Sequence, residues 1–147
     1  MIAVVQRVSS ATVVAAEAEH EASIGPGLVT LLCVEENDTE EDARWMSSKL
    51  ARLRVFADDE GKFNRSVQDL DGSIMLVSQF TLAGDCRKGN RPSFITAADP
   101  ELGRSMCELV QHELETTHEV AVETGVFQTS MQVTLVNEGP ATFIVQR

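Results

Sequence analysis

The chain has 147 residues, a length typical of one domain, and we expect a single domain over residues 1–147. Hydrophobic residues make up 43% and charged residues 24%, which excludes an intrinsically disordered chain. The formal net charge of −11 excludes a protein that coats nucleic acid non-specifically, because such binding needs many Lys and Arg side chains on the contact face.

The cysteines and the apolar stretches indicate the cellular compartment. Cys33, Cys86 and Cys107 are an odd number without CxxC spacing, which favours a reducing cytosol and predicts no metal site. The N-terminus lacks a basic segment followed by a long apolar run, and the longest apolar stretch, residues 28–34, is too short to span a membrane. We therefore expect a complete, cytoplasmic protein with no membrane partner and no cofactor.

Strands are expected along much of the chain. In the first half they cover residues 2–8, 12–16 and 28–34, and a turn at residues 24–27 leads into the third. After a turn at residues 57–64, further strands are expected at 73–78, 119–123, 131–136 and 141–145. Gly139-Pro140 lies in the join between the last two. A hairpin turn is the simplest interpretation, although hairpins more often use Asn-Gly or Asp-Gly.

Two helices are expected between these strands. Asp38 with Glu41 resembles a capping box at the start of the first helix, and Asp99-Pro100 starts the second. The expected apolar stripes are Ala43, Met46, Leu50 and Leu53 in the first helix and Leu102, Met106, Leu109, Val110 and Leu114 in the second. Many strands, two helices and several hairpin-like joins predict an α+β domain with a strongly curved, barrel-like sheet.

The segment VSQFTL is the main candidate for chemistry. Here a buried strand ends in polar residues, and Ser78 or Thr81 could act as nucleophile or hydrogen-bond donor, or simply bond to nearby backbone. No general base flanks Thr81 in the sequence. The three histidines lie in a polar hairpin and at a helix end, and Cys86 has no histidine nearby to act as a base, so none of these is expected to be catalytic.

Seven segments in order resemble the D-aminoacyl-tRNA deacylase (D-tyrosyl-tRNA deacylase) family over essentially the whole chain. They are VVQRVSSATV, IGPGLVTLL, VSQFTL, CRKGNRPSF, VETGVF, MQVTLVN and NEGPATF, and the combination of SQFTL with NxGPxT is specific. The resemblance implies a homodimer of barrel-like α+β subunits. It further implies hydrolysis of the ester that joins a D-amino acid, or glycine, to the 3′-terminal adenosine of tRNA.

The resemblance also implies a role for the Gly-Pro pair. The Gly139-Pro140 peptide is expected to be cis and to reach across the dimer interface into the partner's active site. There its carbonyls would exclude a side chain of L configuration, so that selection works by exclusion. Arg7 is expected to fix the orientation of this element, because a guanidinium can hold two backbone carbonyls at once.

The remaining roles follow from the SQFTL and MQVTLVN segments. Ser78 and Gln79 are expected to line the pocket around the terminal adenosine, where backbone N–H groups at Phe80 and its neighbours hold the developing oxyanion. Met131 resembles an adenine-pocket residue, with plain core packing as the alternative. Thr81, like Phe80, is expected to be a catalytic-site residue, but the family points to activation of water by the ribose 2′-hydroxyl instead of a threonine nucleophile.

A basic loop completes the expected site. Arg87, Lys88 and Arg91 are candidates for phosphate contacts in an otherwise acidic chain. The chain departs from the family pattern at Ala83 and at residues 128–130, which puts the shape of the pocket mouth and the adenine seat in doubt. Two other functions stay open: a non-catalytic module that binds an RNA terminus or adenosine, and an editing domain that works with a synthetase.

Overall fold

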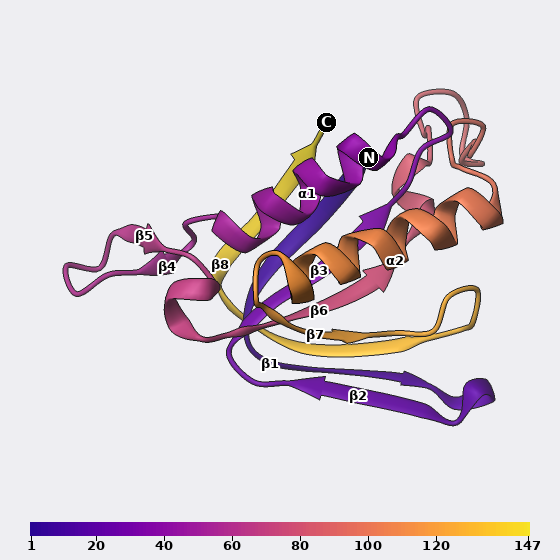
Figure 1. Cartoon of the computed structure of the whole chain (residues 1–147). Coiled ribbons are helices and arrows are strands. Elements are labelled where there is room, and N and C mark those ends of the chain that lie inside the picture. Colours follow the sequence, from indigo (N-terminus) through magenta and orange to yellow (C-terminus); the bar gives the residue numbers. More distant parts are fainter.

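The computed structural model describes residues 1–147 and contains a six-stranded, barrel-like sheet with two helices packed on one side (Figure 1). The strand order is β2-β1-β3-β6-β7, and β8 pairs with β1. The strands of this sheet are β1 (Ile2–Ala15), β2 (His20–Ile24), β3 (Gly27–Cys33), β6 (Ser73–Ser78), β7 (Ala121–Thr124) and β8 (Gln132–Gln146). The predicted α+β class with a strongly curved sheet is confirmed.

The other elements are short, apart from the two helices. The helices are α1 (Glu40–Arg52) and α2 (Pro100–Thr116), and neither has the length and apolar composition to cross a membrane. A small hairpin of β4 (Phe56–Ala57) and β5 (Phe63–Arg65) projects from the body of the molecule (Figure 1). Single 3₁₀ turns are η1 (Ala16–Ala18), η2 (Gln68–Leu70) and η3 (Phe80–Ala83).

The strands β3 and β6 are parallel and lie in the middle of the molecule, buried on both faces. Side chains alternate between the faces of a strand, so Leu28 and Leu32 pack under the helices while Val29 packs inside the curl formed by β1 and β2. Burial on both sides explains why these strands read as nearly continuous apolar runs. Each fully buried aliphatic side chain stabilises the fold by about 1.5–3 kcal/mol.

β1 and β8 are each one long strand where the sequence predicted two. The first half of β1 pairs with β3 and the second half with β2, while β8 follows β1 along its other edge. The register between β1 and β8 shifts near Val8, between the pairs Gln6↔Thr142 and Val8↔Asn137. The polar breaks in the sequence therefore mark a bend and a change of partner, and the strands themselves continue. Gly139-Pro140 lies within β8, so the hairpin interpretation is wrong.

The predicted cap of α1 is wrong by one residue. The Asp42 carboxylate accepts hydrogen bonds from the Thr39 N–H (2.8 Å) and hydroxyl (2.6 Å), so Thr39 is the N-cap. Asp38 instead accepts a hydrogen bond from the ammonium group of Met1 (2.6 Å), a partner distant in sequence that local pattern could not reveal. The predicted cap of α2 is confirmed, because the Asp99 carboxylate accepts from the N–H groups of Glu101 (2.9 Å) and Leu102 (3.0 Å).

Candidate active site

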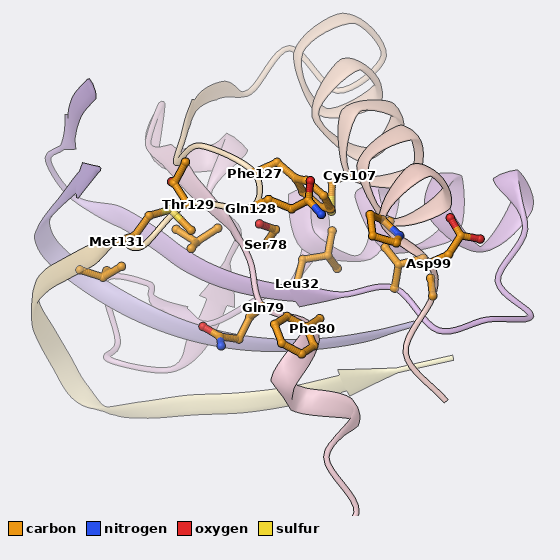
Figure 2. A pocket seen from close by; sticks show the side chains of 16 residues that line it. Leu32, Ser78, Gln79, Phe80, Asp99, Cys107, Phe127, Gln128, Thr129 and Met131 are labelled. Atoms are coloured by element: carbon orange, nitrogen blue, oxygen red, sulfur yellow. The ribbon is translucent and has the colours of Figure 1, made fainter. Parts of the chain in front are cut away.

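A pocket of about 660 Å³ opens where β6 ends (Figure 2). Four parts of the chain that are distant in sequence form its walls: the end of β3, the end of β6, the first turns of α2 and the segment after β7. The lining side chains from these parts include Ser78, Gln79, Phe80, Asp99, Gly103, Cys107, Phe127, Gln128, Thr129 and Met131. Ser78, Gln79, Phe80 and Met131 thus lie together in one cavity.

Thr81 lies next to the pocket but has no base beside it. Its hydroxyl accepts a hydrogen bond from the side-chain amide of Gln79, and no histidine or carboxylate contacts it. Asp99 is the carboxylate in the pocket wall, and its oxygen already accepts the two N–H groups that begin α2. A hydroxyl without a base is a weak nucleophile at neutral pH, so this geometry does not activate Thr81.

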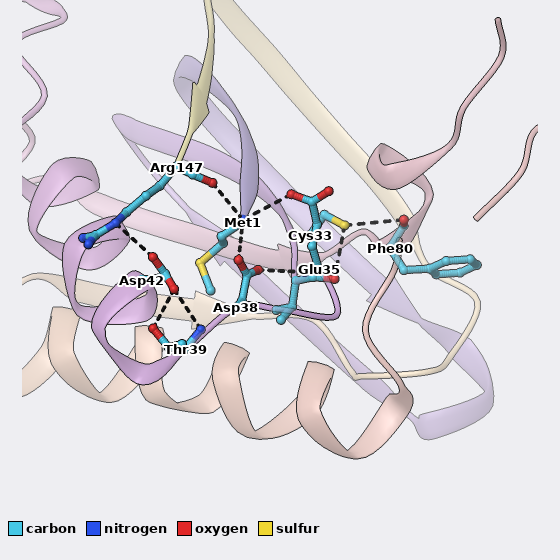
Figure 3. Close-up of polar contacts among 9 residues, drawn as sticks. Met1, Cys33, Glu35, Asp38, Thr39, Asp42, Phe80 and Arg147 are labelled. Atoms are coloured by element: carbon cyan, nitrogen blue, oxygen red, sulfur yellow. Dashed lines mark hydrogen bonds and ion pairs between the residues drawn. The ribbon is translucent and has the colours of Figure 1, made fainter. Parts of the chain in front are cut away.

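The backbone at Phe80 and Thr81 turns sharply after the strand. The first hydrogen bond of the turn runs from the Leu82 N–H to the Gln79 carbonyl (3.2 Å), so the N–H groups of Phe80 and Thr81 precede it. Below the turn, the Cys33 thiol lies 3.5 Å from the Phe80 carbonyl oxygen and can donate to it (Figure 3). Burial raises the pKa of Cys33, so this thiol stays protonated and acts as a support for the turn.

Cys107 in the pocket wall is also a neutral thiol. Burial raises its pKa to about 12, so at neutral pH it carries no thiolate. The pocket therefore combines apolar walls with uncharged polar groups at Ser78, Gln79 and Thr129, and its one carboxylate, Asp99, is already engaged in capping α2. Such a cavity fits a largely neutral ligand fragment and offers orientation and backbone hydrogen bonds, with no side-chain nucleophile of its own.

Gly139-Pro140 lies outside the pocket of its own chain, on an outward bulge of β8. The peptide bond is cis. The Arg7 side chain links the bulge to the segment after α1, donating from Nε to the Glu138 carbonyl (2.8 Å) and from the terminal nitrogen to the Val55 carbonyl (2.6 Å). A Cβ atom at position 139 would meet the Ala141 nitrogen and lie 2.8 Å from Oδ1 of Asn137, so only glycine fits there.

The basic residues Arg87, Lys88 and Arg91 lie on an exposed loop of residues 86–92, called the basic loop below. Two backbone hydrogen bonds between Asp85 and Ser93 (2.8 and 3.1 Å) close its base. The Arg87 guanidinium binds the Asp85 carboxylate with two contacts (2.9 and 2.7 Å) and lowers the pKa of that carboxyl to about 2. Lys88 and Arg91 make no ion pair, so they are the free cations of the loop.

Comparisons with known proteins agree with this geometry. The family model described as D-Tyr-tRNA(Tyr) deacylase matches residues 4–146. The chain belongs to this family. A D-aminoacyl-tRNA deacylase of Desulfitobacterium hafniense is 52% identical over 99% of the chain and 96% of the relative. One of Pelobacter propionicus is 50% identical over the full length of both proteins. A solved structure named c-Myc DNA Unwinding Element Binding Protein superposes with a TM-score of 0.91 at 36% identity, covering 100% of this chain and 99% of that one.

Sequence reasoning did not assign site roles to three residues of this deacylase-family pocket, Phe127, Gln128 and Thr129. The Phe127 ring packs against Gly103 of α2, where an added Cβ would lie 3.3 Å from the ring, and the Arg104 guanidinium lies 4.8 Å from its centroid. A glycine inside a helix costs roughly 1 kcal/mol relative to alanine, so Gly103 was the available signal that something packs closely there. Two residues of the departure at 128–130, Gln128 and Thr129, thus line the pocket.

Proposed function

We propose that the protein is a D-aminoacyl-tRNA deacylase. It hydrolyses the ester between a D-amino acid, or glycine, and the 3′-terminal adenosine of tRNA, releasing the free amino acid and the tRNA. The pocket carries this proposal, because the SQFTL strand end and Met131 meet in one cavity in a chain that belongs to the deacylase family. The terminal adenosine occupies this cavity, with the ester beside Phe80 and Thr81.

The reaction is assisted by the substrate. The ribose 2′-hydroxyl helps to activate water, and the N–H groups of Phe80 and Thr81 hydrogen-bond the developing oxyanion, a contribution of about 2.7–4 kcal/mol per donor. The absence of a base at Thr81 and the neutral thiols support this route over a covalent one. An aminoacyl ester is already reactive, so orientation and charge stabilisation suffice.

Rejection of L-amino acids comes from the Gly-Pro element of a second copy of the chain. In one copy the element lies outside the pocket, and a carbonyl wall in the partner's pocket excludes an L side chain without recognising any particular D side chain. An apolar row on the outer face of the sheet supports a homodimer: Leu31 and Ile144 both pair with Val4, and Ile144 is 74% exposed. β8 is also a long edge strand, which proteins usually cover.

The basic loop contacts tRNA phosphates. Lys88 and Arg91 are free to do so, and they stand out in a chain of net charge −11. In such a chain a local patch, and not the overall charge, must attract the RNA.

The test is hydrolysis of D-aminoacyl-, L-aminoacyl- and glycyl-tRNA, resolved by thin-layer chromatography. We expect turnover of the D and glycyl substrates and protection of the L substrate. Tight binding of the RNA terminus without hydrolysis would contradict the proposal and indicate a binding module. Activity that requires a stable complex with a synthetase would indicate an editing domain instead.

A further inference from the structure

We propose that the ring of Phe94, held edge to face by Phe80, forms a stacking platform for the nucleotide that precedes the terminal adenosine. This inference rests on the proposed function and extends it from the adenosine pocket to a second nucleotide subsite. Phe80 lines the pocket, and its ring meets that of Phe94 edge to face, with centroids 5.5 Å apart and planes at 64°. The pair therefore continues the pocket wall outward to a residue that is not part of the pocket.

Both rings remain accessible. Phe80 is 60% exposed and Phe94 is 38% exposed, although large aromatic side chains are normally buried. Phe94 is fixed from behind, because it packs so closely on Gly84 that a Cβ there would lie 3.0 Å from the ring. A rigid, exposed aromatic surface of this kind is what single-stranded nucleic acids use, since every base has a flat face that can stack on it.

The charge beside the platform matches the same occupant. Phe94 directly follows Ser93, whose two backbone hydrogen bonds to Asp85 close the base of the basic loop. Lys88 and Arg91 on that loop are unpaired, whereas Arg87 is held by Asp85. Aromatic rings followed by free cations fit a base with its phosphate. An acidic protein surface would use the cations but leave the ring faces without a partner, so we commit to RNA.

The experiment compares three D-aminoacyl substrates, each of which has one chemical group more than the one before. The first is aminoacyl-adenosine, the second carries an abasic nucleotide before the adenosine, and the third carries cytidine there, as tRNA does. We expect kcat/KM to rise by about tenfold from the abasic to the cytidine substrate, the lower part of the range for stacking of one base on an aromatic side chain. Equal values for these two substrates would overturn the platform and leave only a phosphate contact.

Variants of Phe94 test whether this residue provides the rise in kcat/KM from the abasic to the cytidine substrate. Phe94→Ala and Phe94→Leu should both reduce the ratio of cytidine to abasic kcat/KM toward one, because leucine keeps apolar volume but cannot stack, whereas Phe94→Trp should preserve it. Ile95→Ala is the matched control, since Ile95 is the adjacent residue and 82% exposed but has no ring; its ratio should equal that of the parent. Both substrates are measured on the same preparation of each variant, so a general loss of folded protein lowers both kcat/KM values equally and leaves their ratio unchanged.

The outcomes separate the two proposals. If none of the three substrates is hydrolysed, the proposed function is wrong. If they are hydrolysed but Phe94→Leu keeps the full ratio, the platform is wrong and the deacylase stands. A weaker dimer in Phe94→Ala by analytical ultracentrifugation, with an unchanged ratio, would assign the exposed rings to a second copy of the chain and also overturn the platform.

Discussion

The pocket and the Gly-Pro element are built in opposite ways. Four segments distant in sequence form the pocket, whose walls are mainly apolar. One short stretch of β8 forms the element, which projects outward and accepts a hydrogen bond from Arg7 at the Glu138 carbonyl. A cavity of this kind can hold a ligand but has little to distinguish mirror images. The element is rigid and sterically exacting but has no cavity. In the function proposed above, binding and chiral selection are therefore separate, and they meet only when two chains combine.

The largest effect should come from the substrate and not from a side chain of the pocket. Replacing the 2′-hydroxyl of the terminal ribose with hydrogen should lower single-turnover hydrolysis about hundredfold or more, because it removes the group that assists water. Thr81→Ala should keep most of the activity, since its hydroxyl has no base. A folded but inert Thr81→Ala protein, together with normal turnover of the deoxy substrate, would make Thr81 the nucleophile and the pocket catalytic by itself.

Arg7→Ala should weaken chiral selection by the Gly-Pro element while leaving the pocket intact. It removes the hydrogen bond that holds the Glu138 carbonyl of the bulge and the one that anchors Arg7 to Val55, each from a charged donor and typically worth about 1.5–3 kcal/mol, and so loosens the bulge that carries Gly139. We expect the ratio of D to L hydrolysis to fall about tenfold or more, mainly through a gain of L activity. Arg52→Ala is the control, because Arg52 makes no side-chain hydrogen bond or ion pair. A loss of D activity with an intact ratio would mean that Arg7 serves stability alone.

Substitutions in the basic loop should lower the affinity for tRNA but leave the ratio of D to L hydrolysis unchanged. Changing Arg87, Lys88 and Arg91 together to alanine should weaken tRNA binding and reduce the slope of log K against log salt by about 1.4–1.8, equivalent to two phosphate contacts, because Arg87 is already bound to Asp85. Asp85→Asn should free Arg87 and steepen the slope. The pKa of Asp85 is about 2, so the pair persists from pH 5 to 8 and adds no pH dependence there. Fluorescence titrations with tRNA at several salt concentrations measure both effects.

The smallest effect is a difference in thiol alkylation rates, which reports how far water reaches the pocket wall. Cys86 on the basic loop is exposed and should react readily with iodoacetamide at pH 8. Cys107 should react far more slowly, since its pKa of about 12 leaves almost no thiolate. Mass spectrometry of a time course gives the two rates. Similar rates would show that the pocket is wetter and more polar than its side chains indicate.

The sequence predicted the parts of the molecule whose signals are local. The strand at Ser73–Ser78, the Asp99 cap and the curved α+β sheet follow from apolar periodicity and helix-start chemistry. The continuity of β1 and β8 and the partner of Asp38 could not be predicted, because each depends on a pairing between residues far apart in sequence. Ser78, Gln79 and Met131, which line the pocket, were proposed as site residues from the family resemblance and not from a local pattern. Phe127 was missed because its role depends on contact with Gly103 of α2.

The central claim is that the Gly-Pro element of one chain excludes L substrates from the pocket of the other. A mixed dimer tests this claim most directly. One subunit carries Ser78→Tyr, which fills its own pocket but keeps its element; the other carries Arg7→Ala, which keeps its pocket but loosens its element. The pair is purified through two different tags and assayed with D- and L-aminoacyl-tRNA.

In this mixed dimer the one working pocket belongs to the Arg7→Ala subunit. If selection acts across the interface, that pocket faces the intact element of its partner, and the dimer rejects L substrates as the parent protein does. L hydrolysis at the level of the Arg7→Ala homodimer, or a protein that stays monomeric while still rejecting L substrates, would contradict the account.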